Sequence, residues 1–180
     1  MKRCLLSSSE IQLSKKLGAG AFGEVWRADQ NGTPDAVKKL HRNKLDEHNL
    51  TAFRNECELQ LSLRHPNLVQ LIGGSWSLED VNVCIVFELC ERGTLEGLLF
   101  KEPTKYTLSW AKHKLPMALG IARAMAHLQK QTPPVIHRDL KPENFLFKDS
   151  SRGSPIKATD FGLSSGRPNA RSQKSCARTP

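Results

Sequence analysis

Two short polar peptides in the second half of the chain constrain it more than any other feature. The first is His137-Arg138-Asp139-Leu140-Lys141-Pro142-Glu143-Asn144, and the second is Asp160-Phe161-Gly162. Asp139 can accept a proton from an incoming hydroxyl, and the Asn144 amide and the Asp160 carboxylate can hold magnesium. These groups are the ones that phosphoryl transfer from a metal nucleotide requires. The alternative is that both peptides are ordinary turns capped by Asp and Asn.

A glycine-rich segment lies upstream, Gly18-Ala19-Gly20-Ala21-Phe22-Gly23-Glu24-Val25, with the spacing G-x-G-x-x-G-x-V. A Walker A loop would need Lys and then Ser or Thr after its last glycine, where Glu24 and Val25 stand. A dinucleotide-binding loop needs a buried strand before it and an acid about twenty residues on. Here residues 12–16 are polar, and Lys38 occupies the distant position. The segment therefore predicts a strand-loop-strand flap whose backbone amides can approach phosphates.

Composition limits the other classes of function. The chain has 180 residues, enough for one core or two small lobes, and a net charge of +9. Its cations are scattered without an aromatic platform, which favours a solvated surface over a nucleic-acid site. Five cysteines without a Cys-x-x-Cys pair indicate neither a disulfide framework nor a zinc site. We expect a soluble, cytoplasmic protein, since no apolar run has the length of a signal-peptide core or a membrane span.

Hydrophobic patterns predict an N-terminal region rich in strands. Three strands are expected within residues 11–40, with a hairpin turn at Asn31-Gly32 that Thr33-Pro34 lengthens. Helical periodicity predicts a helix over 46–64, which Pro66 ends. Two strands should follow, over 68–72 and 83–88, and the second is apolar enough to be buried on both faces.

The rest of the chain is expected to be mainly helical, with two short strands. A short helix is predicted from Gly93 to Phe100, and a longer one with Pro116 in its first turn, which leaves 108–115 as a separate turn. The apolar face of the longer helix is predicted to comprise Ala118, Ile121, Ala122, Met125 and Leu128. Short strands are expected over 145–147 and 156–158. The tail, 164–180, is rich in Ser, Arg, Asn and Pro and is predicted to be mobile.

Taken together, the glycine segment, Lys38 and the two polar peptides resemble the eukaryotic protein kinase family very closely. The resemblance implies an α+β, bilobal fold, with an antiparallel-sheet N-terminal lobe that carries one main helix, and a helical C-terminal lobe. It covers residues 11–180, divided into an N-lobe (11–88), a hinge (89–92) and part of a C-lobe (93–180), after an extension over 1–10. The family's Ala-Pro-Glu motif and later helices are absent, so we expect a fragment or a truncated product.

The resemblance also implies catalytic roles. Lys38 would bind the α- and β-phosphates and pair with Glu56 on the following helix. Asp139 would orient and deprotonate the acceptor hydroxyl, and Lys141 would neutralise the γ-phosphate as it transfers. ATP and Mg²⁺ would be the cofactors, with Asn144 and Asp160 as the metal ligands.

The same resemblance supplies a nucleotide site. Phe87 falls at the gatekeeper position, and the backbone of Glu88 and Cys90 in the hinge would bond the base. The apolar walls would be Val25, Ala36 and Leu146. The phosphate flap would consist of Gly18, Ala19, Gly20, Ala21, Phe22 and Gly23. Cys90 is expected to be an unreactive hinge cysteine.

These roles imply a protein kinase that acts on serine and threonine hydroxyls of protein substrates, because Lys141 through Asn144 is typical of that class. Several flanking sequences resemble the tyrosine-kinase-like group of serine/threonine kinases. The alternative is a truncated, inactive nucleotide-binding or interaction protein. Ser172 and Ser175 are candidate activating phosphosites, with Arg138 as the partner of the phosphate. Gln60 stands where the family usually has an apolar residue, and its amide must either form hydrogen bonds within the protein or remain solvated.

Overall fold

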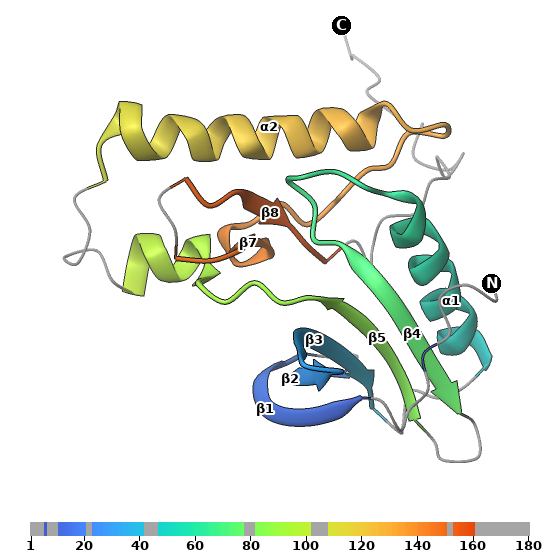
Figure 1. The fold of residues 1–180 in the computed structure, drawn as a ribbon. Helices are drawn as coiled ribbons and strands as arrows, with labels where there is room; N and C mark the ends of the chain where they lie inside the picture. The colour runs from blue at the N-terminus through green and yellow to red at the C-terminus, as the bar shows by residue number, and fades with distance from the viewer. Residues whose placement is uncertain are drawn as a thin grey trace, which may run out of the picture.

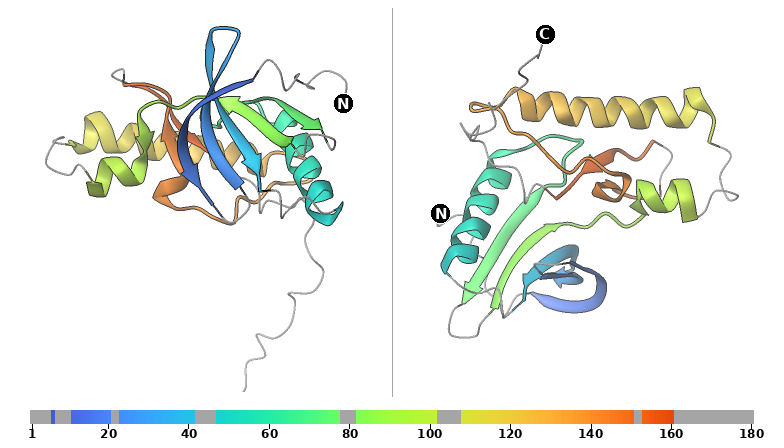
Figure 2. Two further views of the ribbon diagram at one scale, coloured as in Figure 1. Left: turned by 90° about the horizontal axis from the view of Figure 1, so that it is seen from below. Right: turned by 180° about the vertical axis from the view of Figure 1, so that it is seen from behind.

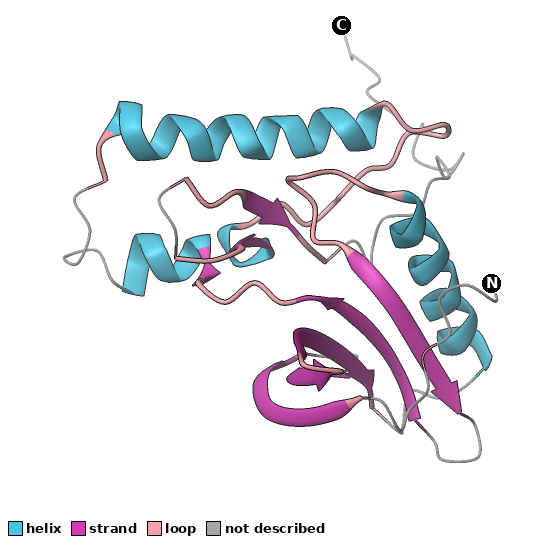
Figure 3. Cartoon of the chain, in the orientation of Figure 1, coloured by secondary structure: helices cyan, strands magenta, loops and turns pink. Residues whose placement is uncertain are grey.

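The computed structural model describes residues 6, 11–20, 23–41, 47–77, 82–101, 108–150 and 153–160. It contains a five-stranded sheet and a three-stranded sheet, with two longer helices (Figures 1 and 3). The larger sheet is antiparallel in the order β1-β2-β3-β5-β4. Its strands are β1 (Gln12–Ala19), β2 (Gly23–Gln30), β3 (Thr33–Leu40), β4 (Leu71–Ser77) and β5 (Asn82–Glu88). This is the antiparallel N-terminal sheet that the sequence predicts.

The turn between β2 and β3 is tighter than predicted. Asn31 and Gly32 both have positive φ, 51° and 82°, as a two-residue hairpin of type I′ requires. Gln30 pairs directly with Thr33, and Asp29 pairs with Pro34. The prediction that Thr33-Pro34 lengthens the connection is therefore wrong, because both residues continue the strand.

Helix α1 (Glu47–Ser62) lies along β4 (Figure 1). The predicted helix is confirmed, but it begins one residue later and ends two residues earlier than the predicted range 46–64. The strand predicted over 68–72 is present, but its predicted bounds are wrong, since β4 begins only at Leu71 and runs to Ser77. Gly73 and Gly74 do not break this strand, because they pair with Val86 and Ile85 across it. The prediction for β5 is confirmed, because the side chains from Val83 to Val86 are all buried.

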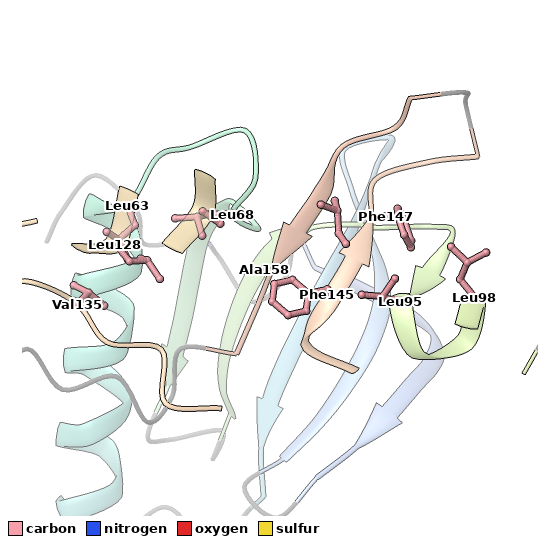
Figure 4. Packing of buried hydrophobic residues seen from close by; sticks show 11 residues of the cluster. Leu63, Leu68, Leu95, Leu98, Leu128, Val135, Phe145, Phe147 and Ala158 are labelled. Atoms are coloured by element: carbon pink, nitrogen blue, oxygen red, sulfur yellow. The ribbon is translucent and has the colours of Figure 1, made fainter. Parts of the chain in front are cut away.

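The smaller sheet has the order β6-β7-β8, formed by β6 (Gly93–Thr94), β7 (Phe145–Phe147) and β8 (Ile156–Ala158). The last two strands have the predicted bounds. Gly93 opens a strand and not the predicted helix, since its φ of +87° excludes a right-handed helical start. The short π-type helix η3 (Gly97–Lys101) follows β6. A cluster of buried apolar side chains fills the space around this sheet, including Phe145 and Phe147 (Figure 4).

A second short π-type helix, η4 (Trp110–Lys114), runs directly into α2 (Leu115–Gln129), with Pro116 in the first turn of α2 as predicted. The predicted apolar face is partly wrong. Ala118 and Ala122 are exposed, whereas Gly120, Ala124 and Leu128 are buried. The close approach of α2 to β8 causes this shift, since a Cβ at Gly120 would stand 2.5 Å from Cγ2 of Ile156.

The segment before β4 joins the two sheets. Leu68 and Ala158 form a parallel bridge, in which Val69 N donates to Ala158 O at 2.9 Å and Ala158 N donates to Asn67 O at 2.8 Å. Leu68 and Val69, which were predicted to lie in a strand over 68–72, are paired with β8 through these bonds instead. In Figure 1 and the right-hand view of Figure 2, β7 and β8 lie between α2 and the strands β1–β3.

No helix in the described ranges combines the length and the apolar character that crossing a membrane requires. Residues 164–180, predicted to be mobile, lie outside the described residues, as do Ser172 and Ser175.

Candidate active site

One face of the larger sheet gathers the residues predicted to surround a nucleotide. Val25 lies opposite Lys38, and Ala36 lies opposite Phe87. Directly opposed residues point to the same face of a sheet, and alternate residues along a strand do so as well. The face therefore carries Val25, Ala36, Lys38 and Phe87 together, and Gly18 joins it through its pairing with Val25. The other face is occupied by a buried cluster of Ala28, Val37, Cys84 and Val86.

The glycine loop between β1 and β2 is closed by its own backbone, because Gly20 N donates to Gly23 O at 2.8 Å. His41 at the end of β3 holds the same loop through Nε2, 3.2 Å from Gly20 O. Gly23 is required by the sheet, since a Cβ there would overlap the carbonyl oxygen of Lys39. A Cβ at Gly18 would meet nothing within 4 Å, so its role is not one of packing. Ala21 and Phe22 lie outside the described residues.

The loop around η5 (Pro142–Asn144) fixes the Asp139 carboxylate. Lys141 Nζ lies 2.7 Å from Asp139 Oδ2. Asn144 Nδ2 donates to both Oδ2 and the backbone carbonyl of Asp139, each at 2.9 Å. The hydrogen bond from Lys141 and then that from Asn144 lower the pKa of Asp139 below its ordinary range. Asp139 is therefore ionised at neutral pH and held in one orientation, so that its carboxylate is able to accept a proton.

Hydrogen bonds to the backbone connect this loop with the segment that ends at Asp160. His137 is buried and bonds Thr159 O through Nε2 at 2.9 Å, and Thr159 N donates to Asn144 O at 3.0 Å. His137 thus packs its ring from the first polar peptide against the segment that leads to the second. Asp160 has a φ of +66°, a left-handed conformation that is unfavourable for a residue other than glycine. Such strain is found most often at functional sites.

The lysine on β3 reaches across to Asp160. Lys38 Nζ lies 3.7 Å from Asp160 Oδ1, so the sheet face and the polar peptides form a single site. Glu56, the predicted partner of Lys38, belongs to α1, but its side chain lies outside the described part of the structure. Their pairing stays a prediction. Gln60, one turn further, is 4 % exposed, so its amide does not stay in solvent.

Asn144 and Asp160 fit the chemistry of a magnesium site. The Asn144 amide nitrogen is engaged with Asp139, which leaves the amide oxygen as its remaining metal-binding atom. The Asp160 carboxylate is half-exposed. Among the described residues no group of three His, Cys, Asp or Glu side chains could hold a metal ion. Magnesium in nucleotide enzymes takes one or two protein oxygens and completes its shell with phosphates and water, so two ligands suffice.

The hinge that follows β5 contains Cys90, whose thiol is partly buried. Burial, and then the negative charge of Glu88, raise the pKa of Cys90 to about 11. The thiol is therefore protonated at neutral pH, which agrees with an unreactive cysteine. Leu146, the predicted lower wall of the base site, lies in β7 opposite Thr94 and is partly buried.

Sequence reasoning missed two lysines beside the hinge. Lys157 Nζ and Lys148 Nζ bind the Glu88 carboxylate at 2.7 and 2.8 Å. A signal for Lys157 was present, because it stands between the apolar residues Ile156 and Ala158 in a predicted strand. A lysine at such a position requires a partner. No comparable signal marks Lys148.

Comparison with known proteins agrees with this geometry. The family model described as the protein kinase domain matches residues 11–180. The chain is 35% identical over 159 residues to the probable serine/threonine-protein kinase drkB of Dictyostelium discoideum, which covers 88% of the chain and 22% of that protein. It is 36% identical over 172 residues to the serine/threonine-protein kinase CTR1 of Arabidopsis thaliana, which covers 95% of the chain and 20% of that protein.

A third relative, the probable serine/threonine-protein kinase drkD of Dictyostelium discoideum, is 34% identical over 171 residues, or 95% of the chain and 13% of that protein. The chain thus spans between about an eighth and a quarter of the length of these relatives. The match to the family model extends over most of the chain and includes every described residue of the site. The chain belongs to the protein kinase domain family.

Proposed function

We propose that the chain acts as a serine/threonine protein kinase domain, which transfers the γ-phosphate of ATP to hydroxyls of protein substrates with the help of Mg²⁺. The observation that carries this proposal is the Asp139 carboxylate, bound at once by Lys141 and Asn144 in a loop that is bonded to the segment of Asp160. The names of the relatives, all serine/threonine-protein kinases, support the choice of acceptor.

The chemistry follows from the positions of the charged groups. Asp139 orients the acceptor hydroxyl and takes its proton as the new O–P bond forms, an effect worth roughly 10²–10⁴-fold in rate. The bond from the γ-phosphorus to the oxygen that bridges it to the β-phosphate breaks in the same transfer, and ADP leaves. Lys141, bound to the same carboxylate, offsets negative charge on the transferring γ-phosphoryl group. Lys38 binds the α- and β-phosphates. Magnesium bound by Asn144 and Asp160 would neutralise the charge that develops on the phosphate oxygens.

The base of the nucleotide is proposed to lie against the sheet face that carries Val25 and Ala36, with Leu146 on the other side. Phe87 lies at the inner end of this base site, and the backbone of Glu88 and Cys90 forms hydrogen bonds with the edge of the base. An apolar cleft with a few fixed polar groups is the usual form of a cofactor site. The assignment to the tyrosine-kinase-like group stays a prediction.

The two acids should have separable effects, which tests the proposal. Asp139→Asn should lower phosphate transfer into a generic Ser/Thr protein substrate by at least about 100-fold, with MgATP affinity nearly unchanged, because the base acts in the transition state. Asp160→Asn should weaken MgATP binding itself. Equal losses of nucleotide affinity in both variants would contradict these roles. A wild-type chain that binds MgATP but transfers no phosphate would favour the non-catalytic alternative.

A further inference from the structure

The start of the hinge carries a group of charges that the proposed chemistry does not use. The Glu88 carboxylate accepts three hydrogen bonds, from Lys157 Nζ at 2.7 Å, Lys148 Nζ at 2.8 Å and Gln70 N at 2.9 Å. Lys157 Nζ also donates to Leu68 O at 3.3 Å. We call Glu88, Lys148 and Lys157, with the backbone of Leu68 and Gln70, the hinge clamp.

The two lysines of the hinge clamp differ in burial. The Lys157 side chain is 10 % exposed and that of Lys148 is 41 % exposed, while the Glu88 side chain is 15 % exposed. A charge this deeply buried is costly unless it is paired. Burial alone would raise the pKa of Glu88, but the hydrogen bonds from Lys148, Lys157 and Gln70 outweigh it and lower that pKa. The Glu88 carboxylate is therefore ionised and forms a buried salt bridge with Lys157, with Lys148 at its edge.

The hinge clamp connects three parts of the chain that lie far apart in sequence: the start of the hinge, the strand β8 and the segment before β4. Glu88 ends β5 and begins the hinge, and its own N–H donates to Gln70 O at 3.0 Å. Lys157 is the middle residue of β8, three residues before Asp160. The segment of Leu68 and Gln70 is hydrogen-bonded to β8 through Val69 and Ala158. A single ion pair thus links the backbone proposed to bind the base with the strand that delivers the proposed metal ligand.

We propose that Lys157 is a positioning residue, which by binding the Glu88 carboxylate fixes the hinge backbone relative to Asp160. This inference rests on the proposed function, because it assigns the hinge to the base of the nucleotide. Lys157 is none of the groups that we propose to contact the nucleotide or the acceptor, since its ammonium binds Glu88 and the Leu68 carbonyl. Its loss should therefore reduce nucleotide affinity and leave the chemical step nearly intact.

The first test needs no nucleotide. Amide hydrogen exchange is measured on the 180-residue chain as wild type, Lys157→Met and Lys148→Met. Methionine keeps the apolar stem of lysine and removes the ammonium group. Lys157→Met should accelerate exchange at Gln70 and Glu88 by at least about tenfold, because their mutual hydrogen bonds lose their anchor. Lys148→Met, at the exposed edge, should change it less than about threefold. Equal rates in Lys157→Met and wild type would overturn the proposal.

The second test separates positioning from a general loss of structure. Lys157→Met should raise the Kd for MgADP by about tenfold, roughly the effect of one charge-assisted hydrogen bond, and leave kcat at saturating MgATP within about twofold. Lys157→Arg, which keeps the charge, should restore most of the affinity. An unchanged Kd, or a fall in kcat equal to the loss of affinity, would overturn the proposal. A wild-type chain that binds no nucleotide would refute the proposed function, and the exchange experiment would still decide whether the clamp exists.

Discussion

The contact between Asp139 and Lys141 shows how one neighbour shifts the pKa of a carboxylate that is proposed to react. Because the hydrogen bond from Lys141 is the largest cause of the lowered pKa of Asp139, Lys141→Met should raise that pKa toward its ordinary value of 3.8. Because the proposed base acts in its ionised form, the acid limb of the kcat profile should move to higher pH in the variant. Its midpoint is read from initial rates between pH 3 and 7, after confirming by circular dichroism that the chain stays folded. An acid limb at the same pH in both proteins would contradict this cause.

A second carboxylate, Asp35 in β3, has the opposite perturbation. It is 2 % exposed, and burial is the main cause of its raised pKa, followed by the charge of Asp29. A raised folded-state pKa means that ionisation destabilises the fold, so stability falls as pH rises from the unfolded value of 3.8 through the folded value.

The substitution Asp35→Asn should therefore stabilise the chain at pH 7, by at least about 1 kcal/mol, because it removes the cost of a buried charge. The gain should shrink as pH falls below 4, where the wild-type carboxyl is protonated too. Urea unfolding of both proteins at pH 7 and at pH 3.5 measures the difference. A wild-type protein as stable as the variant at pH 7 would show that Asp35 is well solvated.

At the scale of elements, the approach of α2 to β8 depends on Gly120. A methyl group there would stand 2.5 Å from Cγ2 of Ile156 and 3.0 Å from Nδ2 of Asn67. Gly120→Ala should lower the free energy of unfolding, because overpacking at a buried contact costs about 1–3 kcal/mol, against a gain in helix propensity of roughly 1 kcal/mol.

Gly97→Ala in η3 is the matched control, since its Cβ would meet only Thr94 Oγ1 at an ordinary 3.4 Å. This substitution should be neutral or stabilising. Thermal unfolding of the two variants compares them directly, and an equal shift in Tm for both would show that α2 can move away from β8 at little cost.

At the scale of the whole molecule, the hydrogen bonds between Asn67 and β8 should make the two sheets unfold together. Asn67 Nδ2 donates to Ile156 O at 2.8 Å, and Asn67 O accepts from Ala158 N. Asn67→Ala should cost about 1–3 kcal/mol, since it leaves the buried Ile156 carbonyl without its donor. Probes placed on β2 and on α2 should report one coincident transition in wild type. Separate transitions in wild type would mean that the sheets are independent.

Much of this molecule follows from local sequence patterns. The strands β7 and β8 have the predicted bounds, and α1 differs from its prediction by one or two residues. The misplaced β4 illustrates the limit, because Leu68 and Val69 are apolar like a strand, yet their backbone pairs with β8. In α2 the apolar pattern did not identify the buried face, because alanines occur on several sides of the helix. The buried face is the one that packs against Ile156. The pair of Glu88 and Lys157 could not be predicted from spacing, because 69 residues separate its members.

The bond between Asn67 and Ile156 also bears on how the molecule is made. Its two residues are 89 positions apart, so the joint between the sheets is a contact of high sequence separation. At about 5–20 residues per second of synthesis, the segment around Asn67 waits on the order of 4 to 18 s for its partner. The loop that must close is long, and the conformational entropy of closing it is lost before the contact contributes any stabilisation. The segment before β4 consequently leaves the ribosome without the strand to which it is hydrogen-bonded in the folded chain, and the contact between the two sheets forms only after β8 has emerged.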